Sequence, residues 1–201
     1  MTTSQVYLKE NATGKTVAAD LHDEVSDAHL AMHDSTWVPV MKAHCAERRL
    51  TDSPEDRNWD WRRKAKDLRP LLGYHSFALV CQNELQGLMW TSDLYSARLG
   101  SQLGKSLVYV EFLATAPWNR KEVQQPSRYS GVGGVLIDAA IQSSLDSGYQ
   151  GRIGLHSLPK AEDFYREKCG MSAFRIDLAH DALMYFEMTA KQAETFRRKR
   201  R

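Results

Sequence analysis

The sequence predicts an α/β fold built on a mixed sheet, and two patterns support this prediction. Residues 107–170 alternate strand, helix, strand and helix, which is the order of a core with parallel strands. On either side, β-rich runs at 74–95 and 174–188 are each interrupted by a short turn, as in an antiparallel hairpin. A parallel core between hairpins makes the sheet mixed.

The N-terminal third predicts one weak strand and two helices. Gln5–Lys9 alternates apolar and polar residues, as a half-buried strand does. Ala28–Arg48 has apolar residues at helical spacing, and Pro39 must start, kink or split this helix because it lacks a backbone N–H. Asp60–Leu68 forms the body of a second short helix, which Pro70 ends.

From residue 74 the hydrophobic period changes from that of a helix to that of a strand. Tyr74–Gln82 and Leu85–Tyr95 are rich in β-formers, and the two polar residues between them predict a hairpin. Leu107–Thr115 is almost continuously apolar, as expected for a strand that is covered on both faces. Pro117 ends that strand.

Two helices and another strand follow. Apolar residues recur from Val132 at i, i+3, i+4, i+7 and i+8, so a helix with one apolar face begins there and stops at Gly148. Arg152–Leu158 is the second strand of the core. Pro159 begins the next helix, which Gly170 closes.

Length and composition indicate one domain over residues 1–190 and a basic tail over residues 191–201. The chain has 201 residues, of which 42% are hydrophobic, enough for a sizeable core. No run approaches the roughly 20 apolar residues of a membrane span, and the N-terminus lacks a signal-peptide pattern. Three widely spaced cysteines match neither a disulfide framework nor a zinc motif. We therefore expect a cytoplasmic protein that does not bind membranes.

The net charge of +2 conceals a basic C-terminus. Residues 197–201 carry five positive charges, so the remainder of the chain has a net charge of −3 (+2 less 5). Such a run can bind RNA, DNA or another anionic surface. It is also typical of a solvated, disordered chain end, and both interpretations stay open.

A glycine-rich segment, Arg-Tyr-Ser-Gly-Val-Gly-Gly at residues 128–134, lies between the apolar strand and the next helix. Backbone N–H groups at a helix N-terminus, with the positive end of the helix dipole behind them, form a site for a phosphate or pyrophosphate. Glycine lets the main chain approach the anion, and Arg128 adds a planar cation. A P-loop would need lysine after Gly134, and a dinucleotide fingerprint would need glycine in place of Leu136. The segment therefore predicts a phosphate-bearing ligand of another kind.

Three motifs occur in order along the chain. They are Leu113-Ala114-Thr115-Ala116-Pro117, Arg128-x-x-Gly131-x-Gly133 and Ala161-x-x-Phe164-Tyr165-x-x-x-x-Gly170-Met171. Together they resemble the GCN5-related N-acetyltransferase (GNAT) superfamily, and the match covers residues 107–175. The chain departs from the family pattern in an insertion at 119–127, in Leu158 where relatives often carry asparagine, and in Met171 where phenylalanine is usual.

The resemblance implies a mostly antiparallel sheet splayed between two parallel strands, 107–115 and 152–158, and flanked by about four helices. Acetyl-CoA would bind where those strands diverge. Its pantetheine arm would pair with backbone groups of Leu113 and Thr115, and its pyrophosphate would bind amides from Tyr129 onward. An N–H near Leu113 would face the thioester oxygen, where charge develops. The implied cofactor residues are Leu113, Ala114, Thr115, Arg128, Tyr129, Ser130, Gly131, Val132, Gly133 and Gly134.

Two residues are candidates for the proton transfers that acetylation of an amine needs. Glu111 is the only charge in its apolar strand and shares a strand face with Leu113, so burial would raise its pKa toward that of a useful base. It could instead pair with an arginine or cap a sheet edge. Tyr165 stands where relatives often carry the tyrosine that protonates the leaving thiolate, and a phenol pKa of about 10 suits that role. It could instead pack beside Phe164 as core.

Candidates for substrate binding are weaker. In the family, the segment between the first two helices often walls the acceptor pocket, so Trp59 and Trp61 could contact substrate or else anchor the core. His156, on the strand facing the cleft, is a second base candidate or an ordinary sheet histidine. No metal is expected, because no acidic partner completes a metalloprotease pattern among the N-terminal histidines His22, His29, His33 and His44.

We therefore expect an acetyl-CoA-dependent N-acetyltransferase, monomeric or homodimeric. The acceptor would be a primary amine of a small molecule, a protein or an aminoacyl-tRNA. One alternative is a non-catalytic acyl-CoA-binding or regulatory module with the same fold, although Glu111 and Tyr165 favour an enzyme. Another is salt-dependent nucleic-acid binding through residues 197–201.

Overall fold

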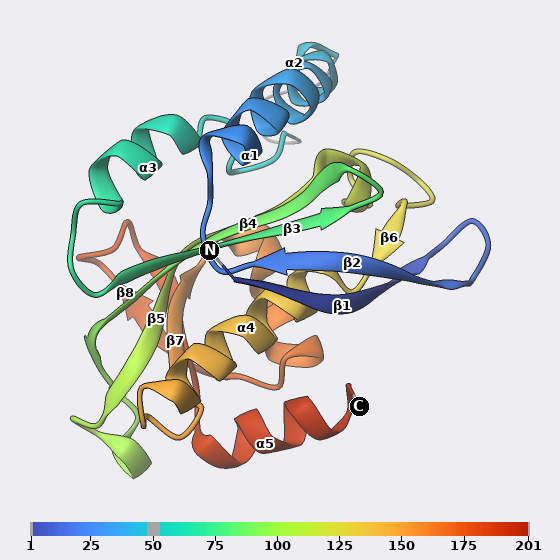
Figure 1. The fold of residues 1–201 in the computed structure, drawn as a ribbon. Helices are drawn as coiled ribbons and strands as arrows, with labels where there is room; N and C mark the ends of the chain where they lie inside the picture. The colour runs from blue at the N-terminus through green and yellow to red at the C-terminus, as the bar shows by residue number, and fades with distance from the viewer. Residues whose placement is uncertain (1, 48–52, 201) are drawn as a thin grey trace. The chain divides into compact units, whose positions relative to one another are not determined.

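The structure, a computed structural model, describes residues 2–47 and 53–200. Within these residues nine strands are hydrogen-bonded in the order β6-β1-β2-β3-β4-β5-β7-β9-β8, and five α-helices accompany them (Figure 1). Strands β5 and β7 are parallel, whereas β1–β2, β2–β3, β7–β9 and β8–β9 are antiparallel. The predicted mixed, mostly antiparallel α/β sheet is confirmed.

The chain forms two compact units. The first consists of Met1–Met89 and Leu113–Leu136, and the second of Trp90–Phe112 and Ile137–Arg201, so that β4, β5 and α4 are divided between them. A single domain over residues 1–190 stays a prediction. The strands are β1 (Thr3–Glu10), β2 (Thr16–His22), β3 (Tyr74–Cys81), β4 (Glu84–Ser96), β5 (Ser106–Thr115), β6 (Tyr129–Ser130), β7 (Ile153–Ser157), β8 (Ser172–Asp177) and β9 (Leu183–Met188). The helices are α1 (Asp27–Met32), α2 (Val38–Ala46), α3 (Trp61–Leu68), α4 (Val132–Asp146) and α5 (Ala190–Arg198).

In the first unit, β1 and β2 form the long hairpin drawn in blue in Figure 1. The sequence predicts β1 but not β2. The inward face of β2 consists of Val17, Ala19 and Leu21, of which only Ala19 is buried. Such a face carries a weak hydrophobic signal, and pairing with β1 and β3 is what holds the strand.

The predicted helix from residue 28 is split. Ser26 caps α1 with its side chain, a π-helical turn covers His33–Trp37, and α2 starts at Val38. Pro39 lies in the first turn of α2, directly after the π-helical turn. The predicted end at Arg48 lies outside the described residues.

Gly87 on β4 lets the first turn of α4 lie close to the strand. A Cβ at this position would lie 2.9 Å from Leu136 Cδ1, 3.1 Å from Val132 Cγ1 and 3.5 Å from the carbonyl oxygen of Ala114. Leu136 is fully buried and Val132 nearly so, so neither side chain can yield cheaply.

Gly87→Ala is therefore expected to lower the free energy of unfolding by about 1–3 kcal/mol, the usual cost of overpacking. Urea unfolding measures it. Gly100→Ala is the matched control, because a Cβ there meets nothing within 4 Å. Equal stabilities of the two variants would contradict the close approach of α4.

The second unit contains the parallel pair, with Val108, Tyr109 and Val110 of β5 opposite residues 153–155 of β7. Instead of the regular helix predicted after Pro159, a 3₁₀ turn at Pro159–Ala161 leads into a π-helical turn at Phe164–Lys168. The Cys169 N–H bonds to the Phe164 carbonyl, five residues back, just before Gly170 takes a positive φ.

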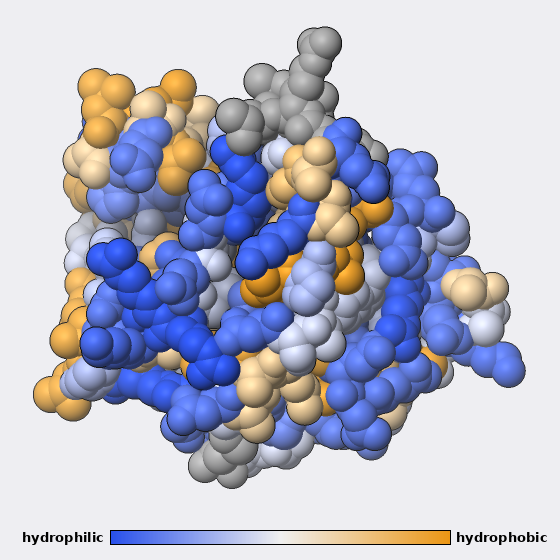
Figure 2. Space-filling view, turned by 90° about the horizontal axis from the view of Figure 1, so that it is seen from above, coloured by the Kyte–Doolittle hydropathy of each residue, from blue (hydrophilic) through white to orange (hydrophobic). Residues whose placement is uncertain are grey.

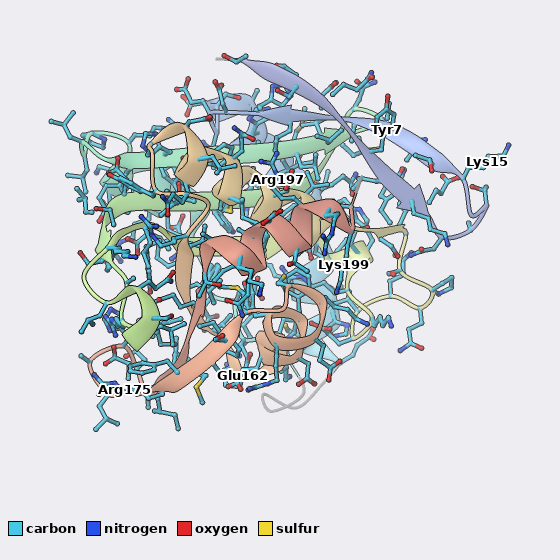
Figure 3. The ribbon with its side chains drawn as sticks, turned by 90° about the horizontal axis from the view of Figure 1, so that it is seen from below. Tyr7, Lys15, Glu162, Arg175, Arg197 and Lys199 are labelled. Atoms are coloured by element: carbon cyan, nitrogen blue, oxygen red, sulfur yellow. The ribbon has the colours of Figure 1, made fainter. Side chains whose placement is uncertain are left out.

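The C-terminal segment forms helix α5 instead of a disordered end. Thr189 and Gln192 make a capping box, and Ala193 and Phe196 are buried. Arg197 pairs with Asp138 of α4 at 3.0 Å, so the basic residues of this segment, of which Figure 3 labels Arg197 and Lys199, are not all available to an anionic partner. Residue 201 lies outside the described part of the chain.

The surface shows no broad apolar face in the direction of Figure 2, where hydrophilic residues predominate and apolar ones form separate small patches. None of the helices that the structure describes is both long and apolar enough to cross a membrane.

Candidate functional site

The first turn of α4 is the centre of the site. The first hydrogen bond within the helix runs from the Val135 N–H to the Gly131 carbonyl at 2.9 Å, so the amides of residues 132–134 precede it. Such N-terminal amides have no partner inside their own helix. Gly131 has a φ of +97°, which only glycine adopts without strain. A glycine turn thus runs into a 15-residue helix, an arrangement whose N-terminal amides can bind an anion.

The segment that leads into this turn is held by Asn11, the residue that follows β1. Asn11 Nδ2 donates to the Ser127 carbonyl at 2.7 Å, and Asn11 Oδ1 accepts from Ser130 Oγ, also at 2.7 Å. The Asn11 N–H donates to the Arg128 carbonyl at 2.9 Å. Asn11, which sequence reasoning missed, therefore fixes three residues just before the glycines.

Tyr129 is a structural part of the loop. Its N–H donates to Asn119 Oδ1 at 3.0 Å, its hydroxyl donates to Gln82 at 2.9 Å, and its ring is 2% exposed. The Tyr129 amide is therefore satisfied within the protein.

Arg128, the predicted cation, is held beside the loop by three contacts. It forms an ion pair with Glu84, and its guanidinium carbon lies 5.1 Å from the centre of the Tyr129 ring. A second nitrogen lies 3.3 Å from the Gln82 side-chain oxygen. The Arg128 side chain is 34% exposed, so part of it faces solvent beside the loop.

Gln86 organises the segment between β5 and the glycine loop. It is fully buried on β4, and its side-chain oxygen accepts from Trp118 Nε1 at 2.9 Å and Asn119 Nδ2 at 3.0 Å. Asn119 in turn accepts the Tyr129 N–H, so one buried amide fixes the start of the insertion and the loop together. A polar residue inside the apolar run 85–90 is the signal that could have identified it.

Arg120, inside the insertion, joins the end of β5 to the segment before α3. Its Nε donates to the Thr115 carbonyl at 2.8 Å, and its two terminal nitrogens bind the two oxygens of Asp56 at 2.6 and 2.7 Å. Each charged side chain of this pair is only 11% exposed. The end of β5, one of the predicted cofactor segments, is thus tied to the residues that precede α3.

The same ion pair lines a cavity of about 240 Å³ in the first unit. Trp59 and Trp61 also line it, with their rings 5.9 Å apart, edge to face. Trp61 is 2% exposed and so belongs to the core as well, whereas Trp59 is half-buried and has Lys64 over its ring at 4.8 Å. His33 completes the aromatic wall, with its ring 6.4 Å from that of Trp61. The structure brings the two predicted tryptophans together at one concave surface.

The predicted base lies on β5 in the second unit. Glu111 is half-buried and lies on the same strand face as Tyr109, two residues earlier. Burial raises the pKa of the Tyr109 hydroxyl, and the Glu111 charge raises it further. The remaining β5 candidates differ in exposure, since Ala114 is buried while Leu113 and Thr115 are half-buried.

The predicted acid, Tyr165, lies in the π-helical turn and is 7% exposed. Its ring contacts Phe164 edge to face at 5.1 Å and Phe186 at 6.0 Å. Burial and the nearby Cys169 raise the pKa of its phenol, which therefore keeps its proton at neutral pH. The phenol is therefore a weaker acid here than the ordinary phenol on which the sequence prediction relies.

His156 lies at the centre of a polar cluster with Asp177 and His180, whose ligand atoms lie within 4.8 Å of one another. This is the one such group in the described ranges, but its geometry does not suit a metal. The His156 and His180 rings stack in parallel at 4.0 Å, so a single ion cannot lie in both ring planes. Arg98 also binds the Asp177 oxygen that would be the third ligand.

Comparisons with known proteins identify the fold. No protein-family model matches the sequence, and no curated protein matches it either. A solved structure assigned to the GNAT family of acetyltransferases, from Desulfovibrio desulfuricans, is 16% identical and has a TM-score of 0.55, over 86% of this chain and 99% of that one. The GNAT domain of PAT from S. lividans is 15% identical with a TM-score of 0.52, over 92% and 96% of the two chains. The chain thus has the fold that its three motifs predict.

Proposed function

We propose that this chain, which has the fold of the GNAT acetyltransferases, is an acetyl-CoA-dependent N-acetyltransferase acting on a primary amine. The first turn of α4 is the observation that carries the proposal. A strain-free glycine turn, a helix dipole and a neighbouring arginine converge there, and together they suit the pyrophosphate of CoA.

Within this site the pyrophosphate would bind the amides of Gly131, Val132, Gly133 and Gly134. Tyr129 and Ser130 would shape the loop, since Tyr129 already donates its N–H to Asn119 and Ser130 its hydroxyl to Asn11. Arg128 would add its charge from the side. The pantetheine arm would run along residues 113–115, where Arg120 holds the Thr115 carbonyl in place.

The chemistry requires two proton transfers. An alkylammonium acceptor must lose a proton before it attacks the thioester, and Glu111 is the proposed base for that step. The leaving thiolate must gain a proton, which the Tyr165 phenol would supply. A backbone N–H near Leu113 would stabilise the oxyanion that forms between these steps.

The acceptor would enter the cavity walled by Trp59 and Trp61. Its aromatic surfaces suit an amine attached to an apolar or aromatic body, and such rings also attract the ammonium form. A lysine already lies over Trp59, which supports this affinity for a cation.

The experiment that tests the proposal begins with calorimetric titration of acetyl-CoA and CoA, followed by a screen of amines for acetylation. Micromolar binding with transfer to an amine supports the enzyme. Binding without transfer to any amine would favour the non-catalytic acyl-CoA-binding module, and absence of binding would refute both.

Tyr165→Phe is expected to lower kcat by about 100-fold, the lower end of what a general acid contributes, and to leave acetyl-CoA affinity unchanged. Steady-state kinetics and calorimetry measure the two effects. Tyr149→Phe, at a half-buried tyrosine of the same unit, is the matched control. An unaltered kcat across the pH range would mean that Tyr165 only packs.

A further inference from the structure

A chain of polar contacts starts on β5 and ends near the surface of the second unit. The Tyr109 hydroxyl lies 2.5 Å from His156 Nδ1, and His156 Nε2 lies 3.2 Å from Asp177 Oδ2. His180 Nδ1 lies 3.1 Å from the same carboxylate oxygen. The side chains become more exposed along this path, at 4% for His156, 16% for Asp177 and 35% for His180. The cluster therefore extends from the interior toward the surface.

Aromatic residues of neighbouring strands contact the rings of Tyr109 and His156. Tyr95 of β4 stacks on the Tyr109 ring at 4.1 Å, and Tyr185 of β9 lies 5.0 Å from the His156 ring. The Tyr185 hydroxyl donates to the buried carboxylate of Glu187 at 2.8 Å, so it is not available to His156.

Charged groups around the cluster fix its resting protonation. The ion pair with Arg98 holds the pKa of Asp177 well below its ordinary value, so Asp177 is a carboxylate. Burial, with help from His180 and Arg98, lowers the pKa of His156 to about 4. At neutral pH His156 is therefore uncharged. The hydrogen-bond network then assigns its proton to Nε2, facing Asp177, and leaves Nδ1 to accept from the Tyr109 hydroxyl.

The path begins next to the proposed base. Glu111 and Tyr109 are two residues apart on one face of β5, and they interact electrostatically. A carboxylate that takes a proton in every turnover must pass it on before the next one. The Tyr109 hydroxyl can take up this proton, because its own proton already points at His156 Nδ1.

We propose that Tyr109, His156 and Asp177 form a relay that carries the acceptor's proton from Glu111 to solvent. The inference rests on the proposed function. Glu111, by itself or through a water, passes the proton to the Tyr109 oxygen as the Tyr109 proton moves to His156 Nδ1. The resulting imidazolium is stabilised by the Asp177 carboxylate, and its Nε2 proton leaves through the exposed end at His180. One proton crosses the path and leaves His156 protonated at Nδ1. A turn of the imidazole ring and of the Tyr109 hydroxyl then restores the starting tautomer before the next transfer.

Three properties suit this arrangement to proton transfer. A histidine with a depressed pKa does not retain the added proton, so the imidazolium forms only transiently. The anionic Asp177 lowers the cost of the transient imidazolium. The contacts join residues from β5, β7 and β8, so the path is held by the sheet itself.

The test compares His156→Gln and Tyr109→Phe with the wild-type protein. Both variants are expected to lower kcat by about 10- to 100-fold at pH 7, with unchanged KM for acetyl-CoA, and to recover part of the rate as the pH rises. His156→Ala is expected to regain activity when imidazole is added. His29→Gln, at another buried histidine with a lowered pKa, is the control and is expected to keep the wild-type pH profile.

A folded His156→Gln variant with the wild-type kcat and pH profile would overturn the relay. Nitrogen NMR of the wild-type imidazoles supplies a readout that does not depend on activity. It is expected to show a His156 ring protonated at Nε2, whose signals shift in Tyr109→Phe, and a ring protonated at Nδ1 would also overturn the proposal. Failure of the wild-type protein to bind acetyl-CoA would count against the proposed function instead, and so the two failures are distinguishable.

Discussion

Gly131→Asp is expected to abolish acetyl-CoA binding, with an affinity loss of at least about 100-fold. The carboxylate would stand at the α4 N-terminus, where the pyrophosphate is proposed to bind, and would compete for the same amides while repelling the ligand. Loss of even two charge-assisted hydrogen bonds, at about 1.5–3 kcal/mol each, accounts for a change of this size. Calorimetric titration with acetyl-CoA measures it.

Two controls separate the charge from backbone strain. Gly131→Ala retains the strain of a side chain at a φ of +97° without the charge, so it is expected to weaken binding less than the aspartate does. Gly104→Asp places the same residue at another positive φ, +75°, with open space around it and outside the loop. It is expected to bind acetyl-CoA normally. Wild-type affinity in folded Gly131→Asp would refute the assignment of the loop.

Arg120→Ala is expected to lower the free energy of unfolding by about 3–5 kcal/mol, the cost of leaving one partner of a buried ion pair alone. Asp56 would lose both of its bonds to the guanidinium at a site where it is only 11% exposed, and the Thr115 carbonyl would lose its partner. Urea unfolding gives the value, and acetyl-CoA titration of the folded variant gives the effect on the end of β5.

The matched control is Arg63→Ala, which breaks a surface pair with Asp67 and is expected to cost less than about 1 kcal/mol. Arg63 and Asp67 are 80% and 59% exposed, so water already screens their attraction. The double variant Arg120→Ala with Asp56→Ala should recover part of the loss, because no uncompensated charge then remains. A cost for Arg120→Ala equal to that of the control would contradict the buried pair.

Local patterns were sufficient for the parts of the fold that depend on neighbours in the sequence. Runs rich in β-formers predict β3 and β4, an almost continuous apolar run predicts β5, and an apolar face with its terminal glycines predicts α4. The glycine turn at residue 131 follows from the same local chemistry, since no other residue adopts its φ cheaply. Strand β2 and helix α5 were missed because their apolar faces are short, and they are stabilised by pairing and packing with distant segments.

The side-chain arrangement of the site depends on such distant contacts. Arg120 meets Asp56 across 64 positions, Tyr109 meets His156 across 47, and Asn11 meets Ser127 across 116. A sequence does not distinguish a charged or polar residue that is solvated from one that is buried against a partner. The sequence alone thus determined the fold class, the order of the motifs and the helix N-terminus that suits an anion. The tertiary structure decided which polar groups pair, because only chain folding brings such residues within hydrogen-bond distance and removes the water around them.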